Sequence, residues 1–504
     1  MKLIMEEGRR DMRFFRIAFI VLCLLLLTPF LRSASAEAGQ RRALLIGCDH
    51  FVSQPDTWPA AENNLRLVAN ALFSDVRRYA LVRTVSDGIA TKEAFEEAVK
   101  AAFQSSGEND TSVLYISTHG IFEENVSNAD AGFLLSDGTA EALITGADLQ
   151  RVLDQVPGKK VVILDACNSG AVIGKGLSGG ADQIFLSGPD YKVLCSAGGS
   201  EASWYFQSPD AAAEGASYFA AVLAFGLDAT GGHAADRNSD GEITLAETYA
   251  YLLEHYAAST PQVYPEMEET EVLYAYDPDA PVSIQKAVTD LTFEDTLLTA
   301  GETEVSFSFT VQRQTELYYQ IVYHREGQWQ FSQAQMIPDH EQDDGTILPG
   351  RKMRVLSLNT GDGDYGYAML QLFTMESGSP VFQGARLLCV RPAAGSVTLS
   401  IETGKSFVPE LGQEMPILAQ HDVPCGLTVN ILNGENRAVR RLAFDMPSRP
   451  QQLSPAASSF FWDGKTSDGE YAPPGLYTVQ VKTEINGAQF LCQSEPFTLE
   501  EAAY

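Results

Sequence analysis

Residues 161–170 have the sequence Val-Val-Ile-Leu-Asp-Ala-Cys-Asn-Ser-Gly, in which an apolar run ends in a cluster of polar and reactive side chains. The run from Val161 to Leu164 is short, uniformly apolar and rich in β-branched residues, which is typical of a strand buried on both faces. Parallel sheets are built from such strands and carry their chemistry beyond the carboxyl ends of the strands. The stretch therefore predicts an α/β fold and places Cys167 where reactive residues are expected.

Further strands and helices are expected on either side of this stretch, alternating along residues 40–265. Apolar runs at 42–47, 112–117 and 191–195 predict three more buried strands. Apolar residues recur at helical spacing over 60–73 and again after Thr91, which can cap a helix. Thr145 and Asp148 have the spacing of a capping box before a third helix. We therefore expect an α/β domain whose mostly parallel sheet has helices on both faces.

The pattern changes beyond residue 280. Segments such as 304–311 alternate polar and apolar residues and are separated by Gly, Asp and Pro, which predicts an antiparallel β-sandwich over 283–393. A second all-β domain is expected over 394–504, and its Trp462-Asp-Gly464 motif is followed by Gly469 and a Pro-Gly turn. This pattern resembles the closing hairpin of the immunoglobulin-like domain of flagellar hook-cap proteins. The resemblance concerns the fold alone.

Length and charge narrow the range of functions. A chain of 504 residues has room for roughly two to four domains of about 150 residues each. Its 35 Lys and Arg against 66 Asp and Glu give a net charge of −31, so nucleic acid and an anionic membrane would both repel it. We therefore exclude nucleic acid as a partner, whereas basic peptides would be attracted.

The first 36 residues have the composition of an export signal. Four arginines precede an apolar run at 17–31, and Ala34-Ser35-Ala36 supplies small residues before a cleavage site. We expect a signal peptide over 1–36 and a mature protein that is secreted or held at the cell envelope, without a membrane span. Retention of the segment as a membrane anchor is the alternative, and the short apolar run counts against it.

The cysteines do not form the dense pattern of a disulfide scaffold. Seven are present, and six of them follow the expected cleavage site. Some can pair in an oxidising compartment, and the sequence leaves the pairs open.

Two of the predicted strands end in residues that fit nucleophilic catalysis. The strand 112–117 is followed by Thr118, His119 and Gly120, and the strand that begins at Val161 by Cys167. A thiolate is a strong nucleophile, and an imidazole beside it can take its proton and later protonate the leaving amine. Gly120 leaves room for a backbone N–H that could form an oxyanion hole with that of Cys167. A buried cysteine and a structural histidine are the alternative, which the joint occurrence of both motifs disfavours.

These motifs resemble those of the caspase-like cysteine peptidases. The Asp-Ala-Cys-Asn-Ser-Gly segment is close to the Asp-Ala-Cys-His-Ser-Gly of bacterial metacaspase-like members, and the pattern extends over residues 42–256. The resemblance implies a Cys–His dyad with His119 as base and acid, Cys167 as nucleophile and Gly120 as oxyanion donor. A dyad needs no third member, so we expect Asp165 to be structural.

Substrate preference is less clearly encoded. Relatives that cleave after Arg or Lys line the primary pocket with acidic residues, because a buried cation needs a carboxylate partner. Metacaspases have an Asn-Asp pair where this chain has Asn63 and Asn64. Three acidic residues could replace the missing carboxylate: Asp49, Asp182 and Glu201. Each alone is more simply explained as a solvated loop charge, and cleavage after basic residues is narrowly favoured. The stretch that begins at Ser196 is expected to pair with substrate as an edge strand.

A twelve-residue loop at 236–247 fits the calcium loop of an EF-hand, with Gly241 at its sharp turn. The expected calcium ligands are Asp236, Asn238, Asp240, Glu242 and Glu247. Thr244 and Glu247 also have the spacing of a capping box, and Asp-Gly pairs form turns without any metal. We expect Ca²⁺ as a cofactor, in a structural role ahead of a regulatory one.

Taken together, these observations predict an exported caspase-like cysteine endopeptidase that acts on peptides or proteins. Two β-sandwich domains would present it or mediate contacts with the cell envelope. A surface binding or adhesion protein with a non-catalytic caspase-like scaffold is the first alternative, although the intact dyad argues against it. Peptide ligation is the second, because an amine can capture a thioester in place of water.

Overall fold

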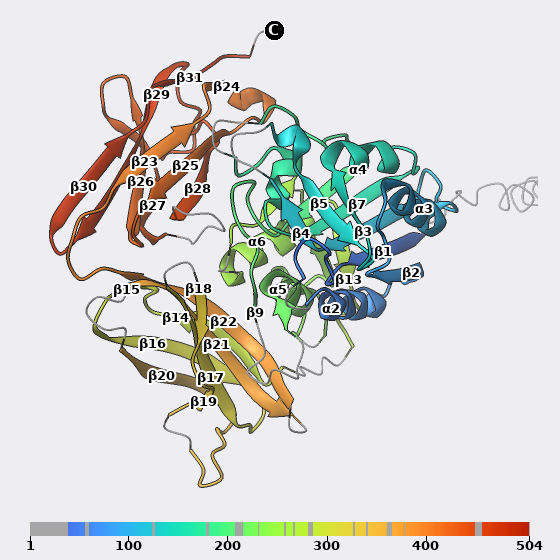
Figure 1. The fold of residues 1–504 in the computed structure, drawn as a ribbon, viewed down its shortest axis with the longest axis horizontal. Helices are drawn as coiled ribbons and strands as arrows, with labels where there is room; N and C mark the ends of the chain where they lie inside the picture. The colour runs from blue at the N-terminus through green and yellow to red at the C-terminus, as the bar shows by residue number, and fades with distance from the viewer. Residues whose placement is uncertain are drawn as a thin grey trace, which may run out of the picture.

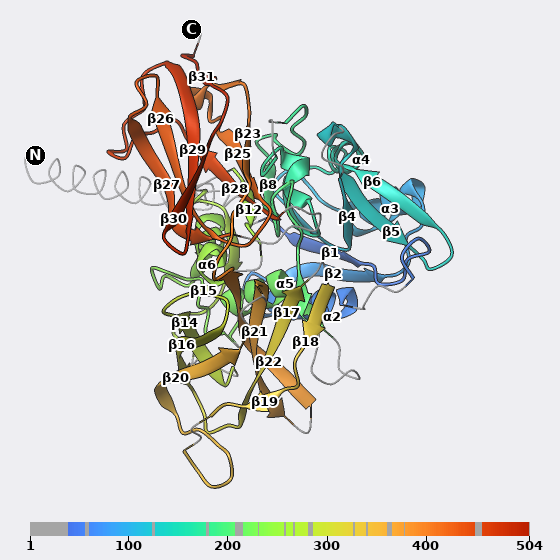
Figure 2. The same cartoon turned by 60° about the vertical axis from the view of Figure 1, so that its left-hand side comes forward.

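The computed structural model describes residues 39–502, apart from short segments at 56–59, 123–126, 178–180, 207–214, 230, 257–258, 266–267, 281–285, 326–327, 339–340, 360–364, 377–378 and 449–455. The signal peptide predicted over 1–36 lies outside the described residues. Figures 1 and 2 show an α/β domain followed by two all-β parts that lie beside it. We call these parts the first β-unit (residues 286–393) and the second β-unit (residues 394–502).

A six-stranded sheet forms the centre of the α/β domain. Its strands lie in the order β12-β8-β7-β3-β1-β2, and neighbours run parallel except β12, which is antiparallel to β8. The bounds are Arg41–Gly47 (β1), Tyr79–Ser86 (β2), Thr111–Ser117 (β3), Lys159–Asp165 (β7), Tyr191–Cys195 (β8) and Gln262–Tyr264 (β12). The four strands predicted from apolar runs are confirmed, and β3 and β7 are neighbours. The residues that follow β3 and β7 therefore meet at one edge of the sheet.

Helices cover both faces of this sheet, as predicted. Their bounds are Ala61–Ser74 (α2), Lys92–Phe103 (α3), Gly146–Leu153 (α4), Tyr218–Leu227 (α5) and Leu245–His255 (α6). Leu45 of β1 packs in one core with residues of α2, α5 and α6, and its neighbour Leu44 packs in the other with residues of α3 and α4. Successive strand residues point to opposite faces, so an uninterrupted apolar run fills both cores.

Two of the helices begin as the sequence predicts. The Thr91 side chain accepts a hydrogen bond from the N–H of Ala94 (3.1 Å) at the start of α3. Thr145 and Asp148 form a capping box at the start of α4. Among the helices formed by the described residues, none combines the length and apolar character needed to cross a bilayer.

A small antiparallel sheet begins directly after β3 and was not predicted. Its strands lie in the order β4-β5-β6. The short strands of the domain are His119–Ile121 (β4), Gly132–Ser136 (β5), Glu141–Thr145 (β6), Tyr205–Phe206 (β9), Ala216–Ser217 (β10), Glu242–Thr244 (β11) and Val272–Ala275 (β13). His119 thus lies on a strand that pairs with β5, rather than in a loop.

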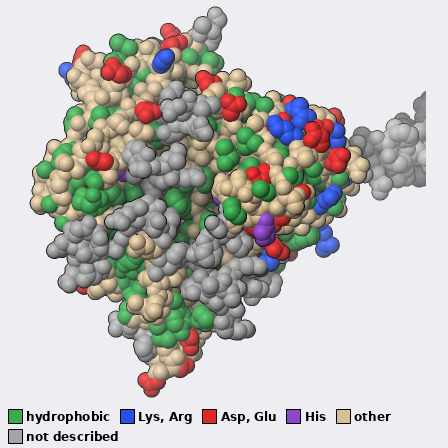
Figure 3. Space-filling model, viewed as in Figure 1, with side chains coloured by type: hydrophobic (Ala, Val, Ile, Leu, Met, Phe, Trp, Pro, Cys, Tyr) green, Lys and Arg blue, Asp and Glu red, His purple; other side chains and the backbone are tan. Residues whose placement is uncertain are grey.

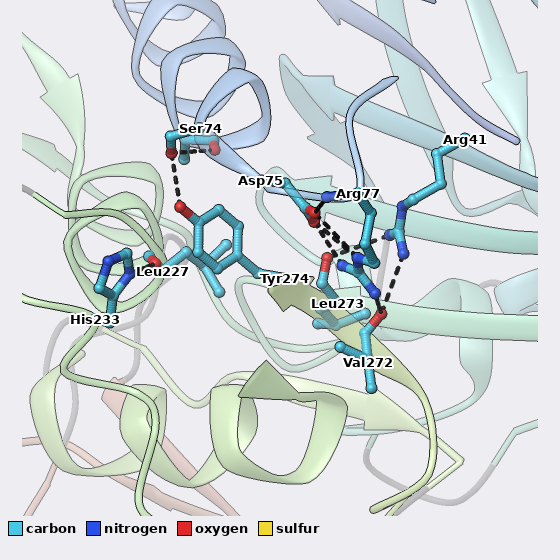
Figure 4. Close-up of polar contacts among 10 residues, drawn as sticks. Arg41, Ser74, Asp75, Arg77, Leu227, His233, Val272, Leu273 and Tyr274 are labelled. Atoms are coloured by element: carbon cyan, nitrogen blue, oxygen red, sulfur yellow. Dashed lines mark hydrogen bonds and ion pairs between the residues drawn. The ribbon is translucent and has the colours of Figure 1, made fainter. Parts of the chain in front are cut away.

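Polar contacts join β13 to the start of β1 and to the end of α2 (Figure 4). The guanidinium groups of Arg41 and Arg77 both donate to the carbonyl of Val272 (3.3 and 2.9 Å). The hydroxyl groups of Ser74 and Tyr274 lie 2.7 Å apart. Strand β13 pairs with β11, and β11 lies within the predicted calcium loop at 236–247. The contacts of β13 therefore also link this loop to β1 and to the end of α2.

The first β-unit contains two sheets. One has the order β14-β16-β20, and the other the order β15-β22-β21-β17-β18 with β19 also paired to β17. The bounds are Val288–Phe293 (β14), Leu297–Thr299 (β15), Glu302–Val311 (β16), Leu317–Arg325 (β17), Gln328–Phe331 (β18), Gln335–Met336 (β19), Gly350–Asn359 (β20), Gly366–Glu376 (β21) and Ser379–Arg391 (β22). One core cluster contains residues from both sheets, among them Phe307 and Leu370.

The second β-unit also contains two sheets, with the orders β23-β25-β28 and β24-β31-β29-β26-β27, and β30 pairs with β29. The bounds are Leu399–Thr403 (β23), Ser406–Phe407 (β24), Met415–His421 (β25), Gly426–Asn433 (β26), Ala438–Pro447 (β27), Ala456–Trp462 (β28), Gly475–Ile485 (β29), Ala488–Gln493 (β30) and Phe497–Leu499 (β31). Trp462 is fully buried, and its indole N–H donates to the carbonyl of Lys465 (2.7 Å). The motif singled out in the sequence therefore closes a turn over the core.

The pairing in both β-units differs from the expectation in one respect. The sheets are antiparallel except for the pairs β15–β22 and β24–β31, which are parallel. In each case a short strand from early in the unit adds to the edge of a sheet completed later in the chain.

Charged side chains gather at one end of the α/β domain. On the face drawn in Figure 3, acidic and basic side chains lie side by side in the region of α3 and α4. Their ion pairs are Lys92–Asp148 (2.6 Å), Lys100–Glu96 (2.5 Å) and Arg151–Glu96 (2.8 Å). The basic residues here are matched by carboxylates, so they do not form a basic patch of the kind that binds nucleic acid.

Candidate active site

A cavity of about 190 Å³ lies at the carboxyl edge of the central sheet. His119, which begins β4 just after β3, and Cys167, which lies just after β7, both line it. The remaining lining residues are Cys48, Asp49, Phe51, Ala60, Ala61, Asn64, Ser117, Thr118, Asp165, Ala166, Ala202, Ser203, Trp204, Tyr205 and Ser217. The fold therefore brings the two predicted catalytic side chains to one partly apolar cavity.

Gly120 lies against the backbone of Cys167. A Cβ atom on Gly120 would lie 1.6 Å from the carbonyl oxygen of Cys167 and 3.2 Å from its amide nitrogen. Any side chain at this position would force the two segments apart. The close approach keeps β4, and with it His119, beside the predicted nucleophile.

Burial controls the ionisation of the Cys167 thiol. Loss of solvation raises its pKa to about 11, and a backbone hydrogen bond at Ser203 opposes part of this shift. At neutral pH the sulfur therefore carries its proton and needs a base before it can act as a nucleophile.

His119 has the properties of such a base. Burial lowers its pKa below the usual 6.5, and the carboxylates of Asp49 and Glu141 partly oppose this shift. The imidazole is therefore neutral at pH 7, and its ring lies 4.6 Å from that of Phe51. A neutral imidazole beside a protonated thiol is an arrangement for general-base activation rather than a resting ion pair.

Asp165 lines the same cavity and was expected only to be structural. Its carboxylate accepts hydrogen bonds from the hydroxyl groups of Tyr115 (2.9 Å), Ser217 (2.9 Å) and Ser203 (3.3 Å). Burial raises its pKa to about 6 although these hydroxyl groups favour the charged form. Asp165 thus joins three segments of the cavity wall, so a structural role is compatible with its contacts.

One wall of the cavity comes from a segment that the sequence gave little reason to single out. Ser203 and Trp204 lead into β9, which begins at Tyr205 and pairs with β10, and Ser217 of β10 donates to Asp165. These residues lie far from Cys167 in the chain and carry no spacing pattern. Only the stretch expected to follow Ser196 pointed towards this region.

Asp49 lies at the cavity, but its carboxylate also caps a helix. Its oxygens accept the backbone N–H groups of Ala60 (2.7 Å), Ala61 (2.8 Å) and Glu62 (3.0 Å) at the start of α2. Ala60 occupies the N-cap position of α2, and its methyl side chain cannot accept a hydrogen bond from the helix. The charge of Asp49 is therefore partly committed to the helix, although it still acts on His119.

The other three predicted substrate-binding residues do not line the cavity. Ser196 is fully buried, and its hydroxyl bonds to the backbone of Ala166. Glu201 is 2% exposed and accepts hydrogen bonds from Gly198 and Thr260. Asp182 is exposed, and its backbone N–H donates to the side-chain oxygen of Asn128 (2.9 Å). The stretch that begins at Ser196 was expected to be an edge strand, but residues 196–204 form turns and irregular structure, and β12 occupies the adjoining edge of β8.

The predicted calcium loop has an ordered turn. The carboxylate of Asp236 accepts the N–H groups of Ser239 (2.7 Å) and Gly241 (3.0 Å) and the hydroxyl of Tyr276 (2.8 Å). Asn238 and Asp240 bond to each other, and Gly241 has a φ of 86°. The loop therefore has the turn that the motif requires at its sixth position.

Charge also gathers at this loop. Burial raises the pKa of Tyr276 to about 12, and the carboxylates of Asp236, Asp240 and Glu247 add to the shift. Glu247 serves in the capping box with Thr244, while its other oxygen accepts the N–H of Arg237 (3.2 Å). Glu242 belongs to β11, and within the described ranges no set of three or more His, Cys, Asp or Glu side chains is arranged to hold a metal.

Comparison with known families supports the assignment of the fold. Residues 6–193 match the CHAT domain, a caspase-like family related to cysteine peptidases. The match includes both His119 and Cys167 and supports a caspase-like fold for the α/β domain. No relative among the curated proteins matches the sequence significantly.

Similar solved structures include a protein from Geobacter sulfurreducens, at 15% identity over 48% of this chain and 96% of that chain, with a TM-score of 0.32. Caspase-1 from Spodoptera frugiperda is 13% identical over 46% of this chain and 90% of its own, with a TM-score of 0.31. A class 5 fimbriae chaperone is 12% identical over 41% of this chain and 100% of its own, with a TM-score of 0.21.

Proposed function

We propose that the chain is an exported cysteine endopeptidase in which His119 and Cys167 form the catalytic dyad. The observation that carries this proposal is that both side chains line one cavity at the carboxyl ends of two neighbouring parallel strands. The caspase-like fold agrees with such chemistry, and peptides are substrates that an acidic protein does not repel.

The reaction begins with proton transfer from the Cys167 thiol to the neutral imidazole of His119. The sulfur attacks the peptide carbonyl carbon, and the backbone N–H groups of Gly120 and Cys167 stabilise the developing oxyanion. The C–N bond then breaks as the imidazolium gives its proton to the leaving amine, which leaves a thioester. Water, deprotonated by His119, hydrolyses the thioester and restores the thiol.

The charge around the cavity supports cleavage after basic residues. Asp49 and Asp165 line the cavity, and Asp165 carries a negative charge above a pKa of about 6. A buried Lys or Arg side chain of the substrate would need such a partner. Asp182 and Glu201 lie outside the lining, so we do not assign them this role.

Peptide cleavage by the mature protein tests the proposal. A library of peptides that differ in the residue before the scissile bond should be cleaved after Lys or Arg, and Cys167→Ala should reduce kcat by about a thousandfold or more. Cys48→Ala is the matched control, because Cys48 lines the same cavity and burial raises its pKa to about 12.

The outcomes separate the alternatives. Equal cleavage by the wild type and Cys167→Ala would overturn the assignment of the nucleophile. Failure of the intact, folded protein to cleave any peptide would instead favour a binding protein on a caspase-like scaffold. An added peptide amine that is incorporated in place of water would identify a ligase.

We further propose roles for the remaining parts. The loop at 236–247 binds Ca²⁺ through the residues predicted above, supported by its turn and by the carboxylates around Tyr276. Both β-units are sandwich modules, the second of them immunoglobulin-like, supported by the two sheets of each unit and by a core cluster between them. The N-terminal signal directs export, after which the β-units contact the cell envelope.

A further inference from the structure

The first β-unit and the α/β domain share one hydrophobic core. A single cluster of buried residues contains sheet and helix residues of the α/β domain together with residues of β15, β17, β21 and β22. The first β-unit contributes Leu297, Val322, Tyr367, Met369, Phe373, Phe382, Leu387 and Cys389. Continuity of this kind is typical of an obligate interface, in which neither side is exposed to water alone.

Gln371 is a polar side chain within this apolar interface. It lies on β21 between Met369 and Phe373 on the same face of the sheet, and it is 1% exposed. Its amide nitrogen donates to the hydroxyl of Tyr218 (2.6 Å), while its carbonyl oxygen has no hydrogen-bond partner among the described residues. Burial of an amide oxygen that accepts no hydrogen bond is unfavourable. The contact with Tyr218 is therefore the structural feature that offsets part of this cost.

Tyr218 is held by the first β-unit from two directions. Besides the hydrogen bond from Gln371, its ring packs edge-on against that of Phe382, with the centroids 6.0 Å apart. The Tyr218 side chain is 6% exposed, although its backbone belongs to α5 of the α/β domain. The first residue of α5 is thus fixed by side chains of another part of the chain.

The backbone of the same residue leads directly to the cavity. The N–H of Tyr218 donates to the carbonyl of Trp204 (3.1 Å). The preceding residue, Ser217, pairs with Tyr205, and its hydroxyl donates to Asp165 (2.9 Å). Trp204, Tyr205 and Ser217 all line the cavity. A side chain of the first β-unit is therefore one residue away from the wall of the candidate active site.

We propose that Gln371 is a positioning residue for substrate binding, which acts through Tyr218 on the wall formed by Ser203–Tyr205 and Ser217. The inference rests on the proposed peptidase function and adds to it a role for the first β-unit. A fixed wall reduces the free energy needed to order the cavity when a peptide binds. Loss of the contact should therefore weaken binding more than it slows the chemical step.

Steady-state kinetics of the full chain test this role. Gln371→Met keeps the size of the side chain and removes its polar atoms, and Tyr218→Phe removes the other partner. Each should raise KM about tenfold and change kcat less than about twofold, since one hydrogen bond is lost. The double variant should be no worse than either single variant, because both remove the same interaction.

Gln320→Met is the matched control. Gln320 is paired with Gln371 on the neighbouring strand β17, is 4% exposed, and donates to the carbonyl of Ser332 (2.9 Å) within the first β-unit. This variant should lower thermal stability as Gln371→Met does but leave KM unchanged. If Gln371→Met and Gln320→Met both reduce the concentration of active enzyme but leave KM unchanged, Gln371 has only a structural role and the inference is wrong.

A second readout does not require turnover. Iodoacetamide alkylates Cys167 from the cavity, and the rate can be followed by mass spectrometry of the peptide that contains it. Gln371→Met and Tyr218→Phe should raise this rate about threefold or more at pH 8, whereas Gln320→Met should not, because only the first two loosen the wall. Equal rates in all variants would overturn the inference. An inactive wild type with the expected alkylation pattern would overturn the peptidase function alone.

Discussion

The backbone of Gly120 lies so close to that of Cys167 that a Cβ atom would be 1.6 Å from the Cys167 carbonyl oxygen. Two separate sheets meet at this point, because β4 leaves the end of β3 while Cys167 follows the end of its neighbour β7. The contact fixes the position of β4, which carries the predicted base, relative to the predicted nucleophile.

Substitution of Gly120 by alanine should therefore lower kcat strongly without unfolding the chain. The two backbones must separate to admit a methyl group, and such misplacement costs about a hundredfold or more in kcat. Gly107→Ala is the control, since no atom lies within 4 Å of a Cβ at that position. Wild-type kcat in Gly120→Ala would contradict the close approach.

The pH dependence of peptide cleavage should reflect a neutral base. Burial lowers the pKa of His119 below 6.5, so kcat/KM should rise with pH to a plateau that is more than half reached at pH 6.5. Burial raises the pKa of Cys167 to about 11, so the rate of its alkylation should keep increasing beyond pH 9. An acid limb with its midpoint above pH 7 would contradict the lowered pKa of His119, whereas a thiolate already formed at pH 6 would indicate a resting ion pair.

Asp165 should make the folded state less stable as pH rises. Its pKa is raised from 3.8 to about 6, so its protonated form favours folding, and this contribution is complete below pH 3.8 and lost as pH rises through 6. Two pKa units correspond to about 3 kcal/mol. Urea unfolding of the wild type and Asp165→Asn at pH 4.5 and 7.5 measures the effect. At the higher pH, the free energy of unfolding of the variant should increase relative to that of the wild type. If the difference between the two proteins is the same at both pH values, the pKa of Asp165 is not raised.

Calcium should raise the thermal stability of the chain if the loop at 236–247 binds it. Asp240→Asn should remove most of the increase in Tm, because this position supplies a side-chain ligand. Glu242→Gln is the matched control, because the seventh position of the loop binds through its backbone carbonyl. If both variants lose the increase in Tm equally, the effect is a general one of negative charge. If calcium does not raise the Tm of the wild type, this loop does not bind calcium.

The sequence predicted the elements whose signal is local. Val161–Leu164 and the other buried strands are uninterrupted apolar runs, and the caps at Thr91 and Thr145 depend on residues three positions apart. Strands such as β4 and β12 are only three residues long, so no period can be recognised in them. Tyr79–Ser86 is a longer strand but lies at the edge of the sheet with a mixed burial pattern, which hides its alternation.

The sequence predicted only those residues of the candidate site that have reactive side chains. His119 and Cys167 are reactive side chains directly after strands, so their approach followed from the topology. The cap that Asp49 provides for α2 and the wall at Ser203–Tyr205 depend on contacts between distant segments, which no spacing reports. Glu201 is predicted from its charge and Ser196 from its place at the start of an expected edge strand, but in the structure both side chains bond to the loops around them.

The core shared between the α/β domain and the first β-unit also bears on how such a chain could have been assembled. A module that is joined only through a linker can be exchanged between genes without loss of either neighbour. Here exchange of the first β-unit would leave the helices of the α/β domain with an uncovered apolar face, to which a new neighbour would have to be fitted residue by residue. Residues 40–393 should therefore be inherited as one piece, and a protease that cuts between these two parts should release neither of them in soluble form.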